Sequence, residues 1–97
     1  MATASLARGL RTVQVLSEFY GVTIRMRFEE HAPAHFQAEY GGTRAAVSFD
    51  GQILRGTLAP RALALVREWA RLRRRELEND WQLARRRRPL APIAPLE

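Results

Sequence analysis

Two alternating segments separated by a short loop constrain the fold of this chain more than any other feature. In the first segment, apolar residues occupy every second position, at Val22, Ile24, Met26 and Phe28. In the second segment the same pattern places Phe36, Ala38 and Tyr40 on one side. Apolar residues with a period of two are typical of strands that bury one face. We therefore predict two neighbouring antiparallel strands joined by the loop 30–34.

Turn signals extend this pair into a larger sheet. Gly41-Gly42 is typical of a two-residue hairpin turn, and Asp50-Gly51 predicts a second tight turn. Between and after these turns we expect strands over 45–49 and 53–58, and Val13–Leu16 is a candidate short edge strand. Residues 1–12 are unpatterned and are expected to form a loose N-terminal extension.

A helix is predicted to follow the strands. Pro60 suits the first turn of a helix, where its missing N–H is not needed. Apolar residues then recur at helical spacing over about 27 residues, which is roughly 40 Å at 1.5 Å per residue. A small sheet is shorter than that, so a kink or break is expected near Leu72–Arg75. The predicted fold class is α+β, with a three- to four-stranded antiparallel β-meander packed against one long or kinked C-terminal amphipathic helix.

The last nine residues have proline at positions 89, 92 and 95. This three-residue period matches polyproline II and places Leu90, Ile93 and Leu96 on one apolar edge. That edge either docks on the protein's own core or binds a partner. We therefore divide the chain into the extension 1–12, a single domain over 13–88 and a proline-rich extended tail over 89–97.

The charge of the chain is concentrated in one segment. The formal net charge is +6, and all 16 basic residues are arginine. Residues 61–88 contain ten arginines and four acidic residues, which accounts for the whole excess. Arginine binds phosphates bidentately, so this segment is a candidate nucleic-acid surface; the alternative is a solvated helix face. The candidate residues are Arg71, Arg74, Arg75, Arg85, Arg86, Arg87 and Arg88.

The composition excludes some classes of protein. The chain has no cysteine, which excludes disulfides and thiolate metal sites. No apolar run approaches the roughly 20 residues of a membrane span. We expect a cytoplasmic protein that does not bind a membrane.

Several motifs in order resemble one bacterial family. They are Phe19-Tyr20-Gly21-Val22, Ile24-Arg25-Met26, His31-Ala32-Pro33-Ala34-His35-Phe36, Glu68-Trp69-Ala70 and Asn79–Trp81. Together they resemble the bacterial domain-of-unknown-function family 4160 over about residues 13–97. Two positions depart from the family pattern, with Ala34 in place of a second proline and Gln37 in place of a third histidine. The resemblance implies one component of a toxin–antitoxin-like two-gene module, with a small protein partner encoded nearby.

Basic, acidic and histidine side chains are predicted to lie together on the two alternating segments and the loop that joins them. If these strands pair, Arg25, Arg27, His35, Gln37 and Glu39 share the polar face, with His31 at its end. His31 and His35 are candidates for acid–base cleavage of RNA, with Arg25 holding the phosphate. A solvated sheet face is the plainer alternative. A metal site at these histidines is a further one, but Gln37 removes an imidazole, and neither a metal nor a cofactor is predicted.

Three classes of function therefore stay open. The first is a module component that binds a protein, RNA or DNA. The second is a small metal-independent ribonuclease-like toxin that uses His31 and His35. The third is a structural adaptor. A homodimer is compatible with all three.

Overall fold

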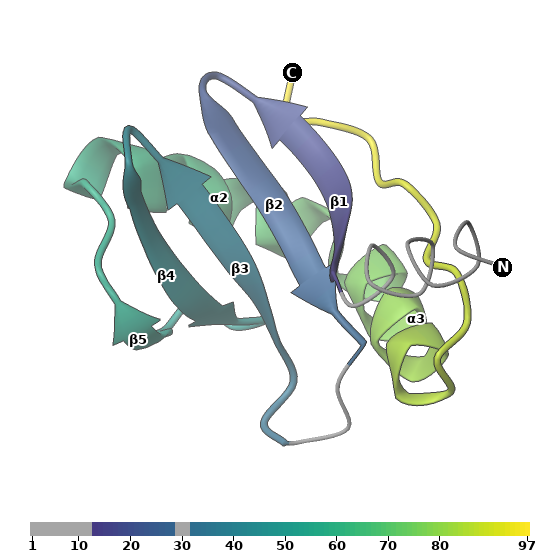
Figure 1. Ribbon diagram of the computed structural model, residues 1–97. Helices are drawn as coiled ribbons and strands as arrows, with labels where there is room; N and C mark the ends of the chain where they lie inside the picture. Colours follow the sequence, from purple (N-terminus) through teal and green to yellow (C-terminus); the bar gives the residue numbers. More distant parts are fainter. Residues whose placement is uncertain (1–12, 29–31) are drawn as a thin grey trace, which may run out of the picture.

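The computed structural model describes residues 13–28 and 32–97 and shows an α+β fold (Figure 1). One antiparallel sheet has the strand order β1-β2-β3-β4-β5. Its strands are β1 (Val13–Phe19), β2 (Val22–Arg27), β3 (His35–Tyr40), β4 (Thr43–Ser48) and β5 (Ile53–Gly56). Helices α2 (Pro60–Leu72) and α3 (Arg74–Arg85) lie on one side of the sheet (Figure 1). The α+β class and the antiparallel meander are confirmed, whereas the prediction of three to four strands and one helix was wrong in both counts. The predicted extension 1–12 lies outside the described residues.

The first strand, β1, is longer than the predicted Val13–Leu16. The prediction stopped short because a β-bulge interrupts the alternation of buried and exposed residues. The pairing of β1 with β2 shifts register between Val15 and Ser17. As a result Leu16 and Ser17 are both buried although they are adjacent in the sequence. A bulge places two residues opposite one, so a period of two cannot persist through it.

The helix breaks at Arg73, within the segment where a kink or break was expected. Arg73 has φ −109° and ψ 24° and separates α2 from α3. Its N–H donates to the Trp69 carbonyl oxygen at 2.9 Å, and its own carbonyl accepts from the Leu77 N–H at 3.0 Å. Trp69 and Leu77 are both fully buried. The break lets both helices turn their apolar stripes toward one small core.

Aromatic side chains connect the sheet to both helices. Trp69 of α2 contacts Phe19 and Phe36, with ring centroids 5.5 and 5.7 Å apart. Phe49, which follows β4, contacts Phe36 at 6.2 Å and Trp81 of α3 at 6.3 Å. These stacked, tilted and edge-to-face pairs stabilise the fold beyond the burial of their area alone.

The proline-rich tail docks on the protein itself, as one of the two alternatives for it requires. Leu90 and Ile93 are buried, and the Ile93 N–H donates to the Leu16 carbonyl oxygen at 2.8 Å. Trp69 Nε1–H donates to the Ala94 carbonyl oxygen at 2.9 Å. The tail therefore runs along β1 (Figure 1) and occupies an otherwise open sheet edge.

Within the described part of the chain, neither helix combines the length and the hydrophobicity needed to cross a membrane.

Candidate functional site

The face of the sheet opposite the helices is polar and carries a shallow hollow. Its volume is about 350 Å³. We call it the sheet-face hollow, and it is lined by Val13, Arg25, Arg27, Gln37, Glu39 and Arg44. Arg25 pairs in register with Gln37, and Glu39 pairs with Arg44. The expectation that Arg25, Arg27, Gln37 and Glu39 share a face therefore describes their placement correctly.

Glu39 links two arginines across this hollow. Arg25 donates through a terminal guanidinium nitrogen to Glu39 Oε1, and Arg44 donates to Glu39 Oε2 at 3.0 Å. The hydrogen bond and charge of Arg25, together with the charge and hydrogen bond of Arg44, hold the pKa of Glu39 below its usual value. The carboxylate is therefore ionised and orients both guanidinium groups.

Arg44 was absent from the predicted site. The sequence nevertheless contained the signal for its position on the polar face, because Arg44 follows the Gly41-Gly42 turn and precedes the inward-facing Ala45. A two-residue turn after Tyr40 makes Tyr40 face Thr43, which sets Arg44 opposite Glu39. Counting back from the turn would have placed this arginine at the site.

His35 departs from the hollow. Its Nδ1 lies 2.8 Å from the Pro33 carbonyl oxygen, an arrangement in which Nδ1–H donates. Its ring packs near Trp81 of α3, with centroids 5.6 Å apart. His35 is half-buried and does not line the hollow that contains Arg25. His31 lies outside the described residues, so the catalytic set of His31, His35 and Arg25 stays a prediction.

The described residues contain no cluster of potential metal ligands. Across 13–28 and 32–97, no three histidine, cysteine, aspartate or glutamate side chains gather closely enough to hold an ion. The metal alternative combines His31 and His35 with Glu39 or Glu29, and of these residues His31 and Glu29 are outside those ranges.

Three of the predicted nucleic-acid-binding arginines surround the break between the helices. Arg74 is engaged with acidic residues, because it donates to Asp50 at 2.9 Å and to Glu78 at 2.8 Å. Its guanidinium carbon lies 5.9 Å from the centre of the Phe49 ring. Arg71 and Arg75 are exposed and line open hollows on either side of Arg74.

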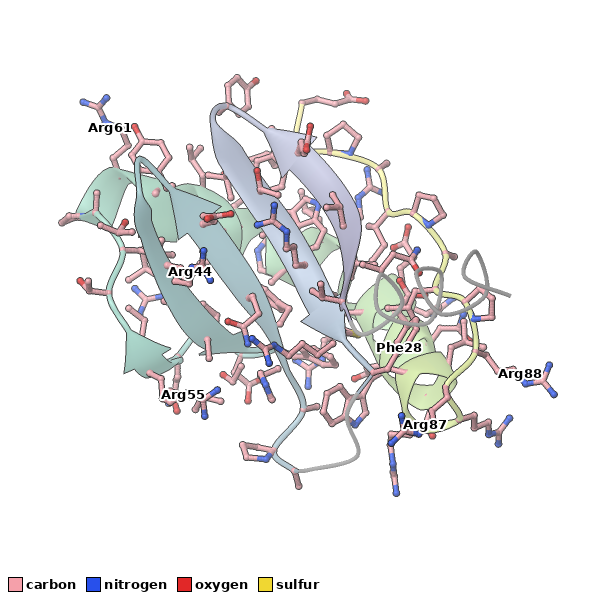
Figure 2. All side chains as sticks on the ribbon, in the orientation of Figure 1. Phe28, Arg44, Arg55, Arg61, Arg87 and Arg88 are labelled. Carbon is pink, nitrogen blue, oxygen red and sulfur yellow. The ribbon has the colours of Figure 1, made fainter. Side chains whose placement is uncertain are left out.

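The other four predicted arginines terminate α3. Arg85 is in its last turn, and Arg86 is the C-cap residue. The Arg87 N–H donates to the Ala84 carbonyl at 3.0 Å, and the Arg88 N–H donates to the Leu83 carbonyl at 2.9 Å. This is the Schellman arrangement, and Arg87, with φ 56°, occupies the left-handed position that glycine usually takes. Arg87 and Arg88 extend from this end of the molecule, opposite the end where Arg61 lies (Figure 2).

Most of these arginine charges are not neutralised by the protein. Within residues 13–28 and 32–97, five of the seven predicted side chains make no ion pair or hydrogen bond; they are Arg71, Arg75, Arg85, Arg86 and Arg88. Cations at the carboxyl end of α3 are favoured by the helix dipole, which explains why they are tolerated there. Their donors face solvent and are available to an anionic ligand.

Comparison with protein families places the chain. The model of a domain of unknown function (DUF4160) matches residues 21–82. The chain belongs to the DUF4160 family. The DUF4160 match includes Arg25, Glu39 and Arg44 of the sheet-face hollow and stops before Arg85–Arg88 and the tail. No curated protein and no solved structure matches the chain.

Proposed function

We propose that this DUF4160 protein is a cytoplasmic component of a toxin–antitoxin-like two-gene module and acts by binding a small protein partner and nucleic acid. The observation that supports nucleic-acid binding is the set of five arginines without partners in the described part of the chain. The two-gene module and its protein partner rest on the family resemblance. The proposal places function in binding surfaces rather than in a catalytic centre.

The helical arginines suit a phosphate backbone for a physical reason. A guanidinium presents five N–H donors in a planar fork that matches phosphate oxygens. Arg85, Arg86 and Arg88 are exposed at one end of α3, and Arg71 and Arg75 lie near its beginning. Binding of this kind is expected to be largely independent of base sequence and strongly weakened by salt.

A pair of double variants tests the nucleic-acid part of the proposal. Arg86→Gln/Arg88→Gln removes two charges from the end of α3, and Arg55→Gln/Arg61→Gln removes the same charge far from it (Figure 2). Binding to a short labelled single-stranded RNA, and separately to a DNA duplex, is measured by fluorescence anisotropy at increasing KCl. We expect the first variant to lower the slope of log K against log salt by roughly 1.5, at about 0.7–0.9 per lost phosphate contact.

The control variant should keep the native slope. Equal slopes in the two double variants would refute a role for the α3 end, because a general loss of charge would then explain both. Absence of binding by the native protein to either nucleic acid would refute the nucleic-acid part of the proposal outright.

Bacterial growth tests the module. The native chain and the His31→Ala/His35→Ala variant are each induced alone, and their accumulation is compared by immunoblot. The binding proposal expects the two histidine changes to leave the growth phenotype unaltered. Growth arrest by the native chain but not by the His31→Ala/His35→Ala variant would instead favour the ribonuclease-like alternative. If neither chain arrests growth, co-expression with the product of the neighbouring gene and co-purification of the two chains tests the partner.

A further inference from the structure

We propose that one exposed stripe of α3 reads base edges in the major groove of duplex DNA. The stripe consists of Arg75, Asn79, Gln82 and Arg86, and we call it the α3 stripe. This inference rests on the proposed nucleic-acid binding and names the form of nucleic acid and the groups that recognise it. Phosphate contacts hold a protein on DNA but carry no sequence information, which comes from contacts to the bases.

Helical spacing places the four side chains of the α3 stripe in one line. Successive members are four, three and four residues apart, and residues at these intervals share one face of an α-helix. All four are exposed. The opposite face of α3 is buried and consists of Leu77, Asp80, Trp81 and Ala84. The α3 stripe therefore faces away from the core, and α3 itself extends past the edge of the sheet (Figure 1).

The hydrogen-bonding groups of the α3 stripe have no partner in the described part of the chain. Across 13–28 and 32–97, the Arg75 and Arg86 guanidinium groups form no ion pair, and the side-chain amides of Asn79 and Gln82 form no hydrogen bond. In the major groove, a guanidinium donates two hydrogen bonds to guanine, and a side-chain amide pairs with the edge of adenine. The α3 stripe thus presents the side chains that read these bases.

The acidic residues of α3 lie off the stripe and are engaged elsewhere. Glu78 accepts from Arg74 at 2.8 Å, and a carboxylate oxygen of Glu76 lies 3.7 Å from a guanidinium nitrogen of Arg73. Asp80 is buried on the core side of the helix. A DNA backbone that approaches the α3 stripe therefore meets two unpaired guanidinium groups, with each exposed carboxylate of the helix already paired to an arginine outside the stripe.

The length of the stripe suits the width of the groove. Arg75 and Arg86 are separated by roughly 16 Å at 1.5 Å per residue. The major groove is about 12 Å wide and admits an α-helix. A helix that lies obliquely in it brings its two ends near the phosphates of opposite strands. Arg71 and Arg88, which are exposed and unpaired in the described residues, stand at these two ends and can contact the backbone.

The surroundings of the α3 stripe favour a duplex over a single strand. Unpaired bases are usually held by stacking on the faces of aromatic side chains. The aromatic residues beside the stripe are Phe49 and Trp81, which are only 7% and 8% exposed. Neither offers a free ring face, so the polar groups of the stripe have to recognise bases by their edges.

Selection of DNA followed by binding measurements tests the α3 stripe. Duplexes with a randomised centre of about twelve base pairs, a little more than one helical turn, are selected on the native full chain. Fluorescence anisotropy then compares the enriched duplex with a scrambled duplex of the same composition. We expect the enriched duplex to bind about tenfold more tightly or better. Asn79→Ala/Gln82→Ala should bring this ratio close to one, because each lost bidentate base contact lowers discrimination by about tenfold.

This double variant separates base reading from charge. It removes no charge, so the affinity for the scrambled duplex and its dependence on salt should be unchanged. Both positions are exposed on a helix and alanine is the best helix former, so the variant should fold. Gln37→Ala/Gln52→Ala removes two amides from the sheet and its turn, and this control should keep the native ratio.

A second variant repeats the test at an arginine. Arg75→Lys keeps the charge but loses the planar fork that bonds a guanine with two hydrogen bonds. It should lower the ratio of the two affinities, whereas Arg61→Lys, at the start of α2, should not.

The outcomes distinguish this inference from the function on which it rests. Binding to duplexes without enrichment of any sequence would overturn the major-groove inference and leave nucleic-acid binding standing. An equal loss of affinity for both duplexes in Asn79→Ala/Gln82→Ala, or binding to single-stranded RNA alone, would also overturn it. Absence of binding to either nucleic acid would refute the proposed nucleic-acid binding as well.

Discussion

Replacing Ile93 by alanine tests whether the proline-rich tail is an integral part of the folded domain. Ile93 is 4% exposed, and its N–H is bonded to the Leu16 carbonyl of β1. The substitution removes three buried carbons at about 0.8 kcal/mol each and leaves a cavity at the margin of the core. We expect a loss of about 2–3 kcal/mol in the free energy of unfolding, which corresponds to a fall in Tm of roughly 10–20 °C in a domain of this size.

The assay is urea unfolding followed by circular dichroism and by tryptophan fluorescence. Fluorescence reports on the tail directly, because the Trp69 indole donates to the Ala94 carbonyl. Leu54→Ala is the matched control, since Leu54 is 39% exposed on β5. It should cost well under 1 kcal/mol, as surface substitutions usually do.

The result has a clear functional consequence. A tail that contributes 2–3 kcal/mol to folding is held against β1 and Trp69 and is not available to bind a partner through Ile93. If Ile93→Ala and Leu54→Ala destabilise the protein equally, the reasoning from burial is refuted and the partner-binding alternative for the tail returns.

Two further predictions concern Asp80 and Tyr20. Desolvation is the main cause that raises the pKa of Asp80, against the lowering effect of the Ala91 N–H bond, so the folded state holds this proton more tightly than the unfolded chain. The contribution of protonated Asp80 to stability is full below its unfolded pKa of 3.8 and is lost as the pH rises through the raised pKa of the folded state. Asp80→Asn should flatten this fall in unfolding free energy, measured by urea titrations at successive pH values. An unchanged fall in the variant would contradict desolvation of Asp80 as its cause. Tyr20 has φ 50°, precedes Gly21 at φ 84° and is 61% exposed. Both positive φ values fit a type I′ turn, which prefers asparagine before glycine. Tyr20→Asn should therefore raise the free energy of unfolding by about 0.5–1 kcal/mol. A decrease would show that the Tyr20 ring makes stabilising contacts.

The candidate sites show where local pattern suffices and where it does not. Period-two alternation correctly grouped Arg25 with Gln37 and Glu39, since side chains at every second position of a strand share a face. The same alternation grouped His35 with them, yet its ring packs near Trp81 of α3. His35 is the first residue of β3, where the chain enters the sheet. A contact with a helix more than forty residues away has no local signature in the sequence. The pairing of Arg74 with Asp50 is of the same kind.

The sequence by itself determined the α+β class, the order of the antiparallel strands and the place where the helix breaks. Those features follow from spacing of two or three to four residues and from turn residues, which act over short distances along the chain. Only the tertiary structure decided which polar groups meet when they are far apart in the sequence: Asp80 with the tail, Trp69 with Ala94, and Arg74 with Asp50. These contacts depend on the packing of α2 and α3 against the core and on the path of the tail along β1. Each results from packing the whole chain into one small core, and packing is a property that no single segment encodes.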